Sequence, residues 1–173
     1  LFNNRIYGLT KGQYSPTSEQ GKITKSTPEG SLDYAFNPVS LALGAEATFV
    51  ARTIDSDRKH MTEVLRRAAA HEGAALVEIY QNCNIFNDGA WEPLKDNDTR
   101  DDTLIRLSDG EPIRFGRDGE KGVARLADGH LKVVDVAEVG EDAILRHDST
   151  AKDPGLAFAL SRLANPRTLT NTP

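Results

Sequence analysis

The most constraining feature of the sequence is an apolar segment, a helical segment and a second apolar segment in direct succession. Residues 47–52 and 75–80 have the composition of buried strands. Asp55 or Ser56 is expected to cap the helix between them, and Gly73 to stop it. One face of this helix is predicted to carry its apolar residues, which are Met61, Val64, Leu65, Ala68 and Ala69. This order predicts a βαβ unit and hence a parallel sheet.

Shorter elements are predicted on both sides of this unit. Residues 1–3 look like a strand end, and Asn37-Pro38 starts a short helix that Gly44 ends. Short strands are expected at 112–116, 122–126 and 131–136, and a last helix from Asp153-Pro154 to Asn165. The predicted fold is α/β: part of a parallel-sheet domain in residues 1–95, and a C-terminal extension of short strands and a helix in 96–173. Because Leu1 stands within a predicted strand, we expect that further sequence precedes it.

Charge, hydropathy and cysteine content exclude several classes of protein. The net charge of −5 argues against nucleic acid as a partner. The longest apolar runs, such as residues 74–77, are too short to span a membrane. Cys83 is the sole cysteine, so no disulfide can form within the chain, and a reducing compartment is indicated. We therefore expect a cytoplasmic protein with neither a nucleic-acid nor a membrane partner.

The segment from Asn3 to Gln13 follows the first predicted strand and is rich in polar residues and glycine. Ligands of open α/β sheets bind at the carboxyl ends of the strands. An Asn side chain there offers an oxygen to Mg²⁺, which commonly sits beside phosphates. Glycines nearby allow backbone amides to approach a diphosphate. The pattern taken alone favours an ordinary surface turn over a ligand site, because Asn and Gly are common turn residues.

Cys83 follows the predicted strand at 75–80. A single cysteine is most often a small buried apolar residue. A catalytic thiolate needs a histidine partner, and nothing in the sequence places His60 or His71 beside the sulfur. An iron–sulfur cluster takes four cysteines as a rule, so Cys83 could ligate one only together with cysteines from elsewhere.

Several stretches of this sequence match one family of enzyme subunits. The stretches are 3–18 (NNRIYGLTKGQYSPTS), 24–28 (TKSTP), 48–52 (TFVAR), 71–87 (HEGAALVEIYQNCNIFN) and 111–116 (EPIRFG). They resemble the β subunit of 2-oxoacid:ferredoxin oxidoreductases, the 2-oxoglutarate type especially, and correspond to its C-terminal part. The resemblance implies that residues 1–95 are the second half of a thiamine-diphosphate-binding α/β domain. The chain departs from the family in lacking a Gly-Asp-Gly triplet and the three further cluster cysteines, which lie upstream of the matched region in the family.

The resemblance also implies roles for individual residues. Asn4 matches the Mg²⁺ ligand, and Ile6 matches the residue whose backbone carbonyl binds the same ion. Cys83 matches the fourth ligand of a [4Fe-4S] cluster. Lys11, together with Leu9, matches positions that face the 2-oxoacid. The residues that match the cofactor-binding turn are Tyr7, Gly8, Leu9 and Thr10. No catalytic residue is assigned within this chain.

The implied activity is the oxidative decarboxylation of 2-oxoglutarate to succinyl-CoA, with electrons passing through the [4Fe-4S] cluster to ferredoxin. The implied cofactors are thiamine diphosphate, Mg²⁺ and the cluster, and the implied partners are the α subunit, ferredoxin, CoA and the 2-oxoacid. By itself the chain is expected to be inactive. A pyruvate-specific or broad 2-oxoacid enzyme is the alternative within the class, although Lys11 favours a second carboxylate. A non-catalytic α/β binding domain is the alternative of another class.

Overall fold

The computed structural model describes residues 1–163 of the chain. The chain divides into two compact units, Leu1–Glu92 and Pro93–Pro173, of which the second is described as far as Leu163. The boundary between these units lies close to the predicted one between residues 95 and 96. That the two units are separate domains stays a prediction. Within residues 1–163, no helix is long and apolar enough to cross a lipid bilayer.

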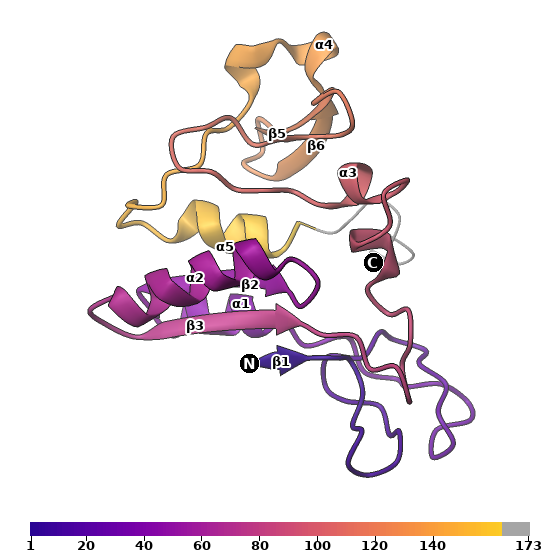
Figure 1. Cartoon of the computed structure of the whole chain (residues 1–173). Helices are drawn as coiled ribbons and strands as arrows, with labels where there is room; N and C mark the ends of the chain where they lie inside the picture. The colour runs from indigo at the N-terminus through magenta and orange to yellow at the C-terminus, as the bar shows by residue number, and fades with distance from the viewer. Residues whose placement is uncertain (164–173) are drawn as a thin grey trace. The chain divides into compact units, whose positions relative to one another are not determined.

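The first unit contains a parallel sheet, which confirms the predicted α/β class. Its described strands are β1 (Phe2–Asn3), β2 (Phe49–Ile54) and β3 (Ala75–Tyr80), in the spatial order β1-β3-β2. Both pairings are parallel, and β3 pairs with β2 from Ala75 opposite Phe49 to Tyr80 opposite Ile54. All strands therefore end at the same edge, from which the loops at 4–37 and 81–92 leave the sheet (Figure 1).

Two helices contact this sheet. Helix α1 (Pro38–Gly44) begins where expected, because the Asn37 side chain accepts a hydrogen bond from the backbone N–H of Ser40 and Pro38 occupies the first turn. Helix α2 (Arg58–Ala70) connects β2 to β3. Both helices lie against β2 and β3. The strand–helix–strand unit predicted from the sequence is thus present.

Two details of this unit differ from the predictions. The N-cap of α2 is Asp57, whose side chain accepts from the backbone N–H of His60, and not Asp55 or Ser56. Strand β2 spans residues 49–54, whereas residues 47–52 were predicted. Asp55 extends its pairing with β3, because the Asp55 N–H donates to the carbonyl of Tyr80. The buried stripe of α2 is also narrower than predicted, because Val64 is buried while Leu65 is 42% exposed.

The second unit contains an antiparallel sheet of short strands. Strand β4 (Arg114–Phe115) pairs with β5 (Lys121–Arg125), which pairs with β6 (Leu131–Asp135). The predicted strand at 112–116 is shortened to Arg114–Phe115; before it, the Ile113 N–H donates to the carbonyl of Leu145, while the Ile113 carbonyl accepts from Val123 of β5. The 3₁₀ turn η1 (Glu92–Leu94) spans the boundary between the two units. The other short elements described in the second unit are α3 (Arg100–Thr103), α4 (Val136–Val139), η2 (Glu141–Ala143) and α5 (Gly155–Ser161).

The second unit has an apolar core of its own. Its buried side chains are Ile113, Phe115, Val123, Ala124, Val136 and Ile144. Gly122 is required where Ile144 packs, because a Cβ at this glycine would lie 2.6 Å from the Ile144 side chain. Helix α5 begins beside Asp153, as predicted, but it ends at Ser161, earlier than the predicted end at Asn165, which lies outside the described residues.

Candidate functional site

The segments that hold Asn4 and Cys83 leave neighbouring strands at the same edge of the parallel sheet. Phe2 and Asn3 of β1 lie opposite Ile79 and Tyr80 of β3. The backbone N–H of Gln81 continues this pairing by donating to the carbonyl of Asn3 at 3.0 Å. Asn4 directly follows β1, and Cys83 follows β3 after Gln81 and Asn82. The prediction that both residues stand at carboxyl ends of parallel strands is confirmed.

The buried carboxylate of Glu78 accepts hydrogen bonds that hold this edge of the sheet together. Glu78 in β3 is fully buried, and its side chain accepts hydrogen bonds from Asn3 Nδ2 and from Arg52 Nε, each at 2.7 Å. The Asn3 side-chain oxygen accepts in turn from the Arg5 backbone N–H at 3.1 Å and from the Thr17 hydroxyl at 2.7 Å. The Asn3 side chain is thus fully engaged in hydrogen bonds within the fold, whereas its neighbour Asn4 is half-buried.

A stack of aromatic and cationic groups forms a second support at the same edge. Tyr80 lies 3.7 Å from Trp91 between ring centroids, with 9° between the ring planes. The Arg52 guanidinium lies 4.9 Å from the Tyr80 ring, and the Arg5 guanidinium lies 4.1 Å from the Trp91 ring. The Trp91 indole N–H donates to the carbonyls of Asn3 and Gln81, so it joins the two strand ends. Burial raises the pKa of Tyr80, despite the opposing effect of Arg52.

Asn4 and Ile6 offer oxygen atoms of the kind that Mg²⁺ binds. The Asn4 side-chain oxygen accepts from the Ile6 backbone N–H at 3.3 Å, which is a long hydrogen bond. Arg5, between them, has a φ of 54°, which turns the chain sharply beyond the strand. An amide oxygen and a carbonyl oxygen are hard donors that suit Mg²⁺. Among residues 1–163 no group of three or more His, Cys, Asp or Glu side chains could hold a metal, so such an ion would need donors of this other kind.

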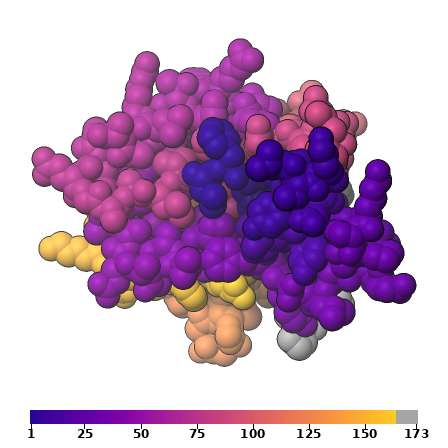
Figure 2. Space-filling view, turned by 90° about the horizontal axis from the view of Figure 1, so that it is seen from below, coloured from indigo at the N-terminus to yellow at the C-terminus, as the bar shows by residue number. Residues whose placement is uncertain are grey.

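The predicted cofactor-binding residues lie in a tight turn that the structure closes by backbone hydrogen bonds. The Tyr7 N–H donates to the Gln13 carbonyl at 2.8 Å, and the Gly12 N–H to the Tyr7 carbonyl at 2.9 Å. Leu9, at the tip, is 97% exposed, and Thr10 and Lys11 are also exposed. Figure 2 shows the first part of the chain, in indigo, at the surface.

One glycine of this turn, Gly12, is needed for its packing, whereas Gly8 leaves room for a Cβ. Gly12 has a φ of +96°, and a Cβ there would lie 2.9 Å from the Phe86 ring. A Cβ at Gly8 would lie 3.7 Å from the same ring. The turn therefore rests on a side chain from the loop that follows Cys83, and substitution of Gly12 would force the two apart.

Cys83 is half-buried, which argues against the simple core cysteine that the sequence left open. Its backbone carbonyl accepts from the Asn87 N–H at 2.9 Å and closes a short turn. The histidines of the intervening helix have other partners: a ring nitrogen of His60 bonds the Thr53 hydroxyl at 2.9 Å, and one of His71 bonds the Thr48 hydroxyl at 2.7 Å. These pairings give no support to a thiolate–imidazole pair.

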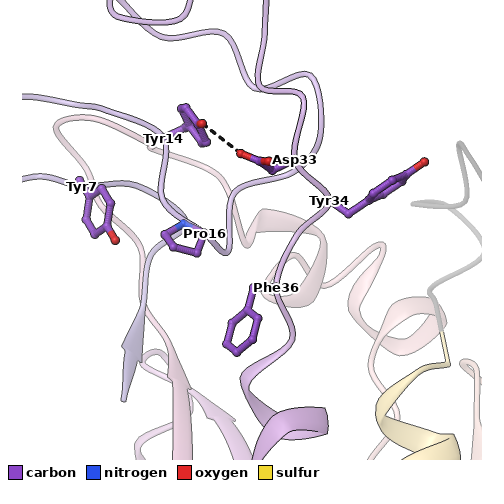
Figure 3. Close-up of a pocket in the computed structure, with 6 residues that line it drawn as sticks. All are labelled: Tyr7, Tyr14, Pro16, Asp33, Tyr34 and Phe36. Carbon is purple, nitrogen blue, oxygen red and sulfur yellow. Dashed lines mark hydrogen bonds between the residues drawn. The ribbon is translucent and has the colours of Figure 1, made fainter.

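A cavity of about 320 Å³ lies among the loops near this turn (Figure 3). Tyr7, of the predicted cofactor turn, belongs to its lining. The Tyr14 hydroxyl donates to Asp33 at 3.0 Å, and this hydrogen bond raises the pKa of Tyr14. The other lining residues are Pro16, Tyr34 and Phe36.

Several residues of this edge escaped the sequence analysis. Glu78 and Arg52 were visible as charges inside predicted buried strands, which is a pattern that demands partners. Asn87, by contrast, is buried and bonds to the Asn4 backbone across the sequence, and no local pattern reveals such a contact. Trp91, which is 4% exposed, packs against the Tyr80 ring.

Residues 1–79 match the family described as thiamine pyrophosphate enzyme, C-terminal TPP binding domain. The chain is 61% identical to 2-oxoglutarate oxidoreductase subunit KorB of Mycobacterium tuberculosis, over 95% of this chain and 44% of that protein. It is 44% identical to the 2-oxoacid:ferredoxin oxidoreductase subunit beta of Saccharolobus solfataricus, over 51% of this chain and 29% of that protein.

A solved structure of the same kind of enzyme is also similar to this chain. It is the 2-oxoglutarate:ferredoxin oxidoreductase from Magnetococcus marinus, with 2-oxoglutarate, coenzyme A and succinyl-CoA bound. The likeness has a TM-score of 0.50 at 42% identity and covers 51% of this chain and 31% of that one. The chain thus spans less than half the length of the relatives it matches. On this similarity, and on a parallel sheet with its polar edge loops, the chain belongs to the β-subunit family of 2-oxoacid:ferredoxin oxidoreductases.

Proposed function

We propose that this chain contributes to the active site of a 2-oxoglutarate:ferredoxin oxidoreductase. The reaction would be the CoA-dependent oxidative decarboxylation of 2-oxoglutarate to succinyl-CoA, with electrons passed to ferredoxin. The observation that carries the proposal is the position of the Asn4 and Cys83 loops on neighbouring strand ends of one sheet edge. Similarity to KorB, a 2-oxoglutarate oxidoreductase subunit, supports the choice of substrate.

Asn4 and Ile6 are the residues that would hold Mg²⁺, through the side-chain oxygen and the backbone carbonyl oxygen. The turn formed by Tyr7, Gly8, Leu9 and Thr10 would lie against thiamine diphosphate. When bound, thiamine diphosphate supplies an electron sink for the loss of CO₂ from the 2-oxoacid. Backbone hydrogen bonds between Tyr7 and Gln13 and between Gly12 and Tyr7 define the shape of this turn.

Cys83 is proposed as one ligand of a [4Fe-4S] cluster whose other cysteines come from outside this chain. Its half-buried position leaves the sulfur able to meet a group from another segment. The α subunit, ferredoxin and CoA are the proposed partners, and a reduced cysteine fits a cytoplasmic protein. The Magnetococcus marinus enzyme has coenzyme A bound, which supports CoA as a partner.

Lys11, with Leu9 beside it, is proposed to select the substrate. A desolvated carboxylate without a partner is unfavourable. The Lys11 ammonium would offset this penalty for the distal carboxylate of 2-oxoglutarate through a charge-assisted hydrogen bond. Pyruvate has a methyl group at that end and would gain nothing from the cation. Lys11 is exposed in the described chain, at a φ of 71°, so its side chain is free to meet a ligand from solvent.

The proposal is tested with the enzyme assembled from full-length subunits. Purified without oxygen, it should contain iron and thiamine diphosphate and reduce ferredoxin faster with 2-oxoglutarate than with pyruvate. Lys11→Ala should lower kcat/KM for 2-oxoglutarate by roughly ten- to a hundredfold, since each decade corresponds to about 1.4 kcal/mol. Its effect on pyruvate should be small. Lys25→Ala, at another exposed lysine of the same long loop, is the control.

Each alternative predicts its own result in this experiment. Two results would contradict a role of Lys11 in substrate selection: a preference of the enzyme for pyruvate, or an equal loss of kcat/KM on both substrates in Lys11→Ala. An assembled enzyme without iron, thiamine diphosphate or ferredoxin reduction would favour a non-catalytic binding domain.

A further inference from the structure

Asn87 occupies a buried position between the loop of Cys83 and the loop of Asn4. It is 7% exposed. Its backbone N–H donates to the Cys83 carbonyl at 2.9 Å and so belongs to the turn that presents the cysteine. Its side-chain Nδ2 donates to the Asn4 carbonyl at 2.9 Å, across 83 residues of sequence. One residue thus bonds directly to the backbone of the proposed cluster ligand and to that of the proposed metal ligand.

The other end of the Asn87 amide is also engaged. Its Oδ1 accepts from the Lys22 ammonium at 2.6 Å, and Lys22 pairs with Glu19 at 3.0 Å. Burial of Glu19 opposes ionisation, but hydrogen bonds from its own backbone and from Lys22 lower the pKa of Glu19 overall. The orientation of the amide is therefore determined from both sides: the cation holds the oxygen, and the N–H group faces Asn4.

A steric contact joins the same two loops beside this hydrogen bond. Phe86 precedes Asn87, and its ring fills the space that a Cβ would occupy at Gly12. The polar contact fixes the start of the cofactor loop at Asn4, and the apolar contact supports the turn farther along. The turn from Cys83 to Asn87 therefore supports the segment from 4 to 13 through one hydrogen bond and one apolar contact.

We propose that Asn87 is a positioning residue, which sets the Asn4–Ile6 segment relative to Cys83 and so couples the metal site to the cluster. The proposal rests on the proposed function, because the roles of Asn4 and Cys83 come from it. A ligand set works within narrow geometric limits, and a misplacement of about 1 Å can reduce catalysis by about a hundredfold. Loss of the bond to the Asn4 carbonyl would release the backbone next to the metal ligand and leave a carbonyl without this donor.

Two substitutions at this position separate positioning from simple folding. Asn87→Asp keeps the size of the side chain and an oxygen for Lys22, but it removes the N–H donor and faces the Asn4 carbonyl with a carboxylate. Asn87→Ala removes both contacts. Asn97→Ala, at an exposed asparagine of the second unit, is the matched control. All three are made in the enzyme assembled from full-length subunits.

The readouts are the dissociation constant of Mg²⁺–thiamine diphosphate by calorimetry, the electron paramagnetic resonance spectrum of the reduced clusters, and the melting temperature. Asn87→Asp should bind the cofactor at least about tenfold more weakly, as expected for one lost buried hydrogen bond. It should also change the cluster spectrum, while the iron content stays near wild type and the enzyme keeps a cooperative melting transition. The control should match wild type in every measurement.

Wild-type affinity and an unchanged spectrum in Asn87→Asp would overturn the positioning role, because the donor to Asn4 would then be irrelevant. If Asn87→Ala fails to fold, the isosteric Asp variant decides alone. Failure of the proposed function is a different result: the wild-type enzyme itself would then lack cofactor binding or the cluster.

Discussion

Replacing Arg52 with methionine should destabilise the first unit, because it leaves the Glu78 carboxylate with less compensation. Glu78 is 0% exposed, and Arg52 Nε donates to it at 2.7 Å. Breaking a fully buried ion pair costs about 3–5 kcal/mol. The Arg52 side chain is 35% exposed, so the cost must be reduced for screening by solvent.

The expected loss can be worked out from the contacts. A hydrogen bond to a charged group contributes about 1.5–3 kcal/mol. The cation–π contact with the Tyr80 ring, at 4.9 Å, adds about 0.5–1 kcal/mol at a partly exposed site. Methionine retains part of the aliphatic packing. The free energy of unfolding should therefore fall by about 2–4 kcal/mol.

Urea denaturation of the chain provides the assay. Trp91 is the sole tryptophan and is stacked on Tyr80, so its fluorescence reports the integrity of this edge. With a slope of about 2 kcal/mol/M, the midpoint should fall by about 1–2 M. Arg66→Met, at an exposed arginine of α2, should shift the free energy by less than about 0.5 kcal/mol.

A double variant tests the physical reason. Glu78→Gln removes the buried charge and retains an oxygen for Asn3, so in the Arg52→Met background it should cost little or restore stability. A loss below about 0.5 kcal/mol in Arg52→Met would mean that the pair behaves as an exposed one. Strictly additive losses in the double variant would also refute the reasoning.

Three further predictions concern the proposed site and its support. Asn4→Ala in the assembled enzyme should weaken Mg²⁺ and thiamine diphosphate binding together, because one of few oxygen ligands is lost; calorimetric titration would reveal unchanged affinity if the assignment is wrong. Cys83→Ala should lower the iron content and abolish the signal of one cluster, and a full complement of iron with normal ferredoxin reduction would contradict this role. Burial raises the pKa of Tyr80 in the folded chain, so the stability that this group contributes is present below about pH 10 and is lost as the pH rises through the higher folded value. Tyr80→Phe should therefore reduce the alkaline loss of stability in urea denaturation at about pH 9 to 11, and identical pH profiles would argue against it.

The elements that sequence patterns predicted well are those whose determinants are local. The cap at Asn37, the helical period between β2 and β3, and the apolar strand at 75–80 each depend on residues a few positions apart. Parallel pairing followed from the order of these elements, and it placed Asn4 and Cys83 at one edge. The N-cap at Asp57 was mispredicted because Asp55 is engaged in holding β2 to the segment after β3, which is a tertiary requirement.

By itself the sequence determined the α/β class, the edge of the sheet at which Asn4 and Cys83 lie, and the family that the matched stretches identify. Only the tertiary structure decided how this edge is held together. Arg52 and Glu78 face each other because the strand register sets them opposite, and Asn87 reaches Asn4 because two loops distant in sequence leave adjacent strands. Local propensities act over a few residues, whereas these partners are selected by the need to satisfy buried polar groups, which exists only once the chain has folded.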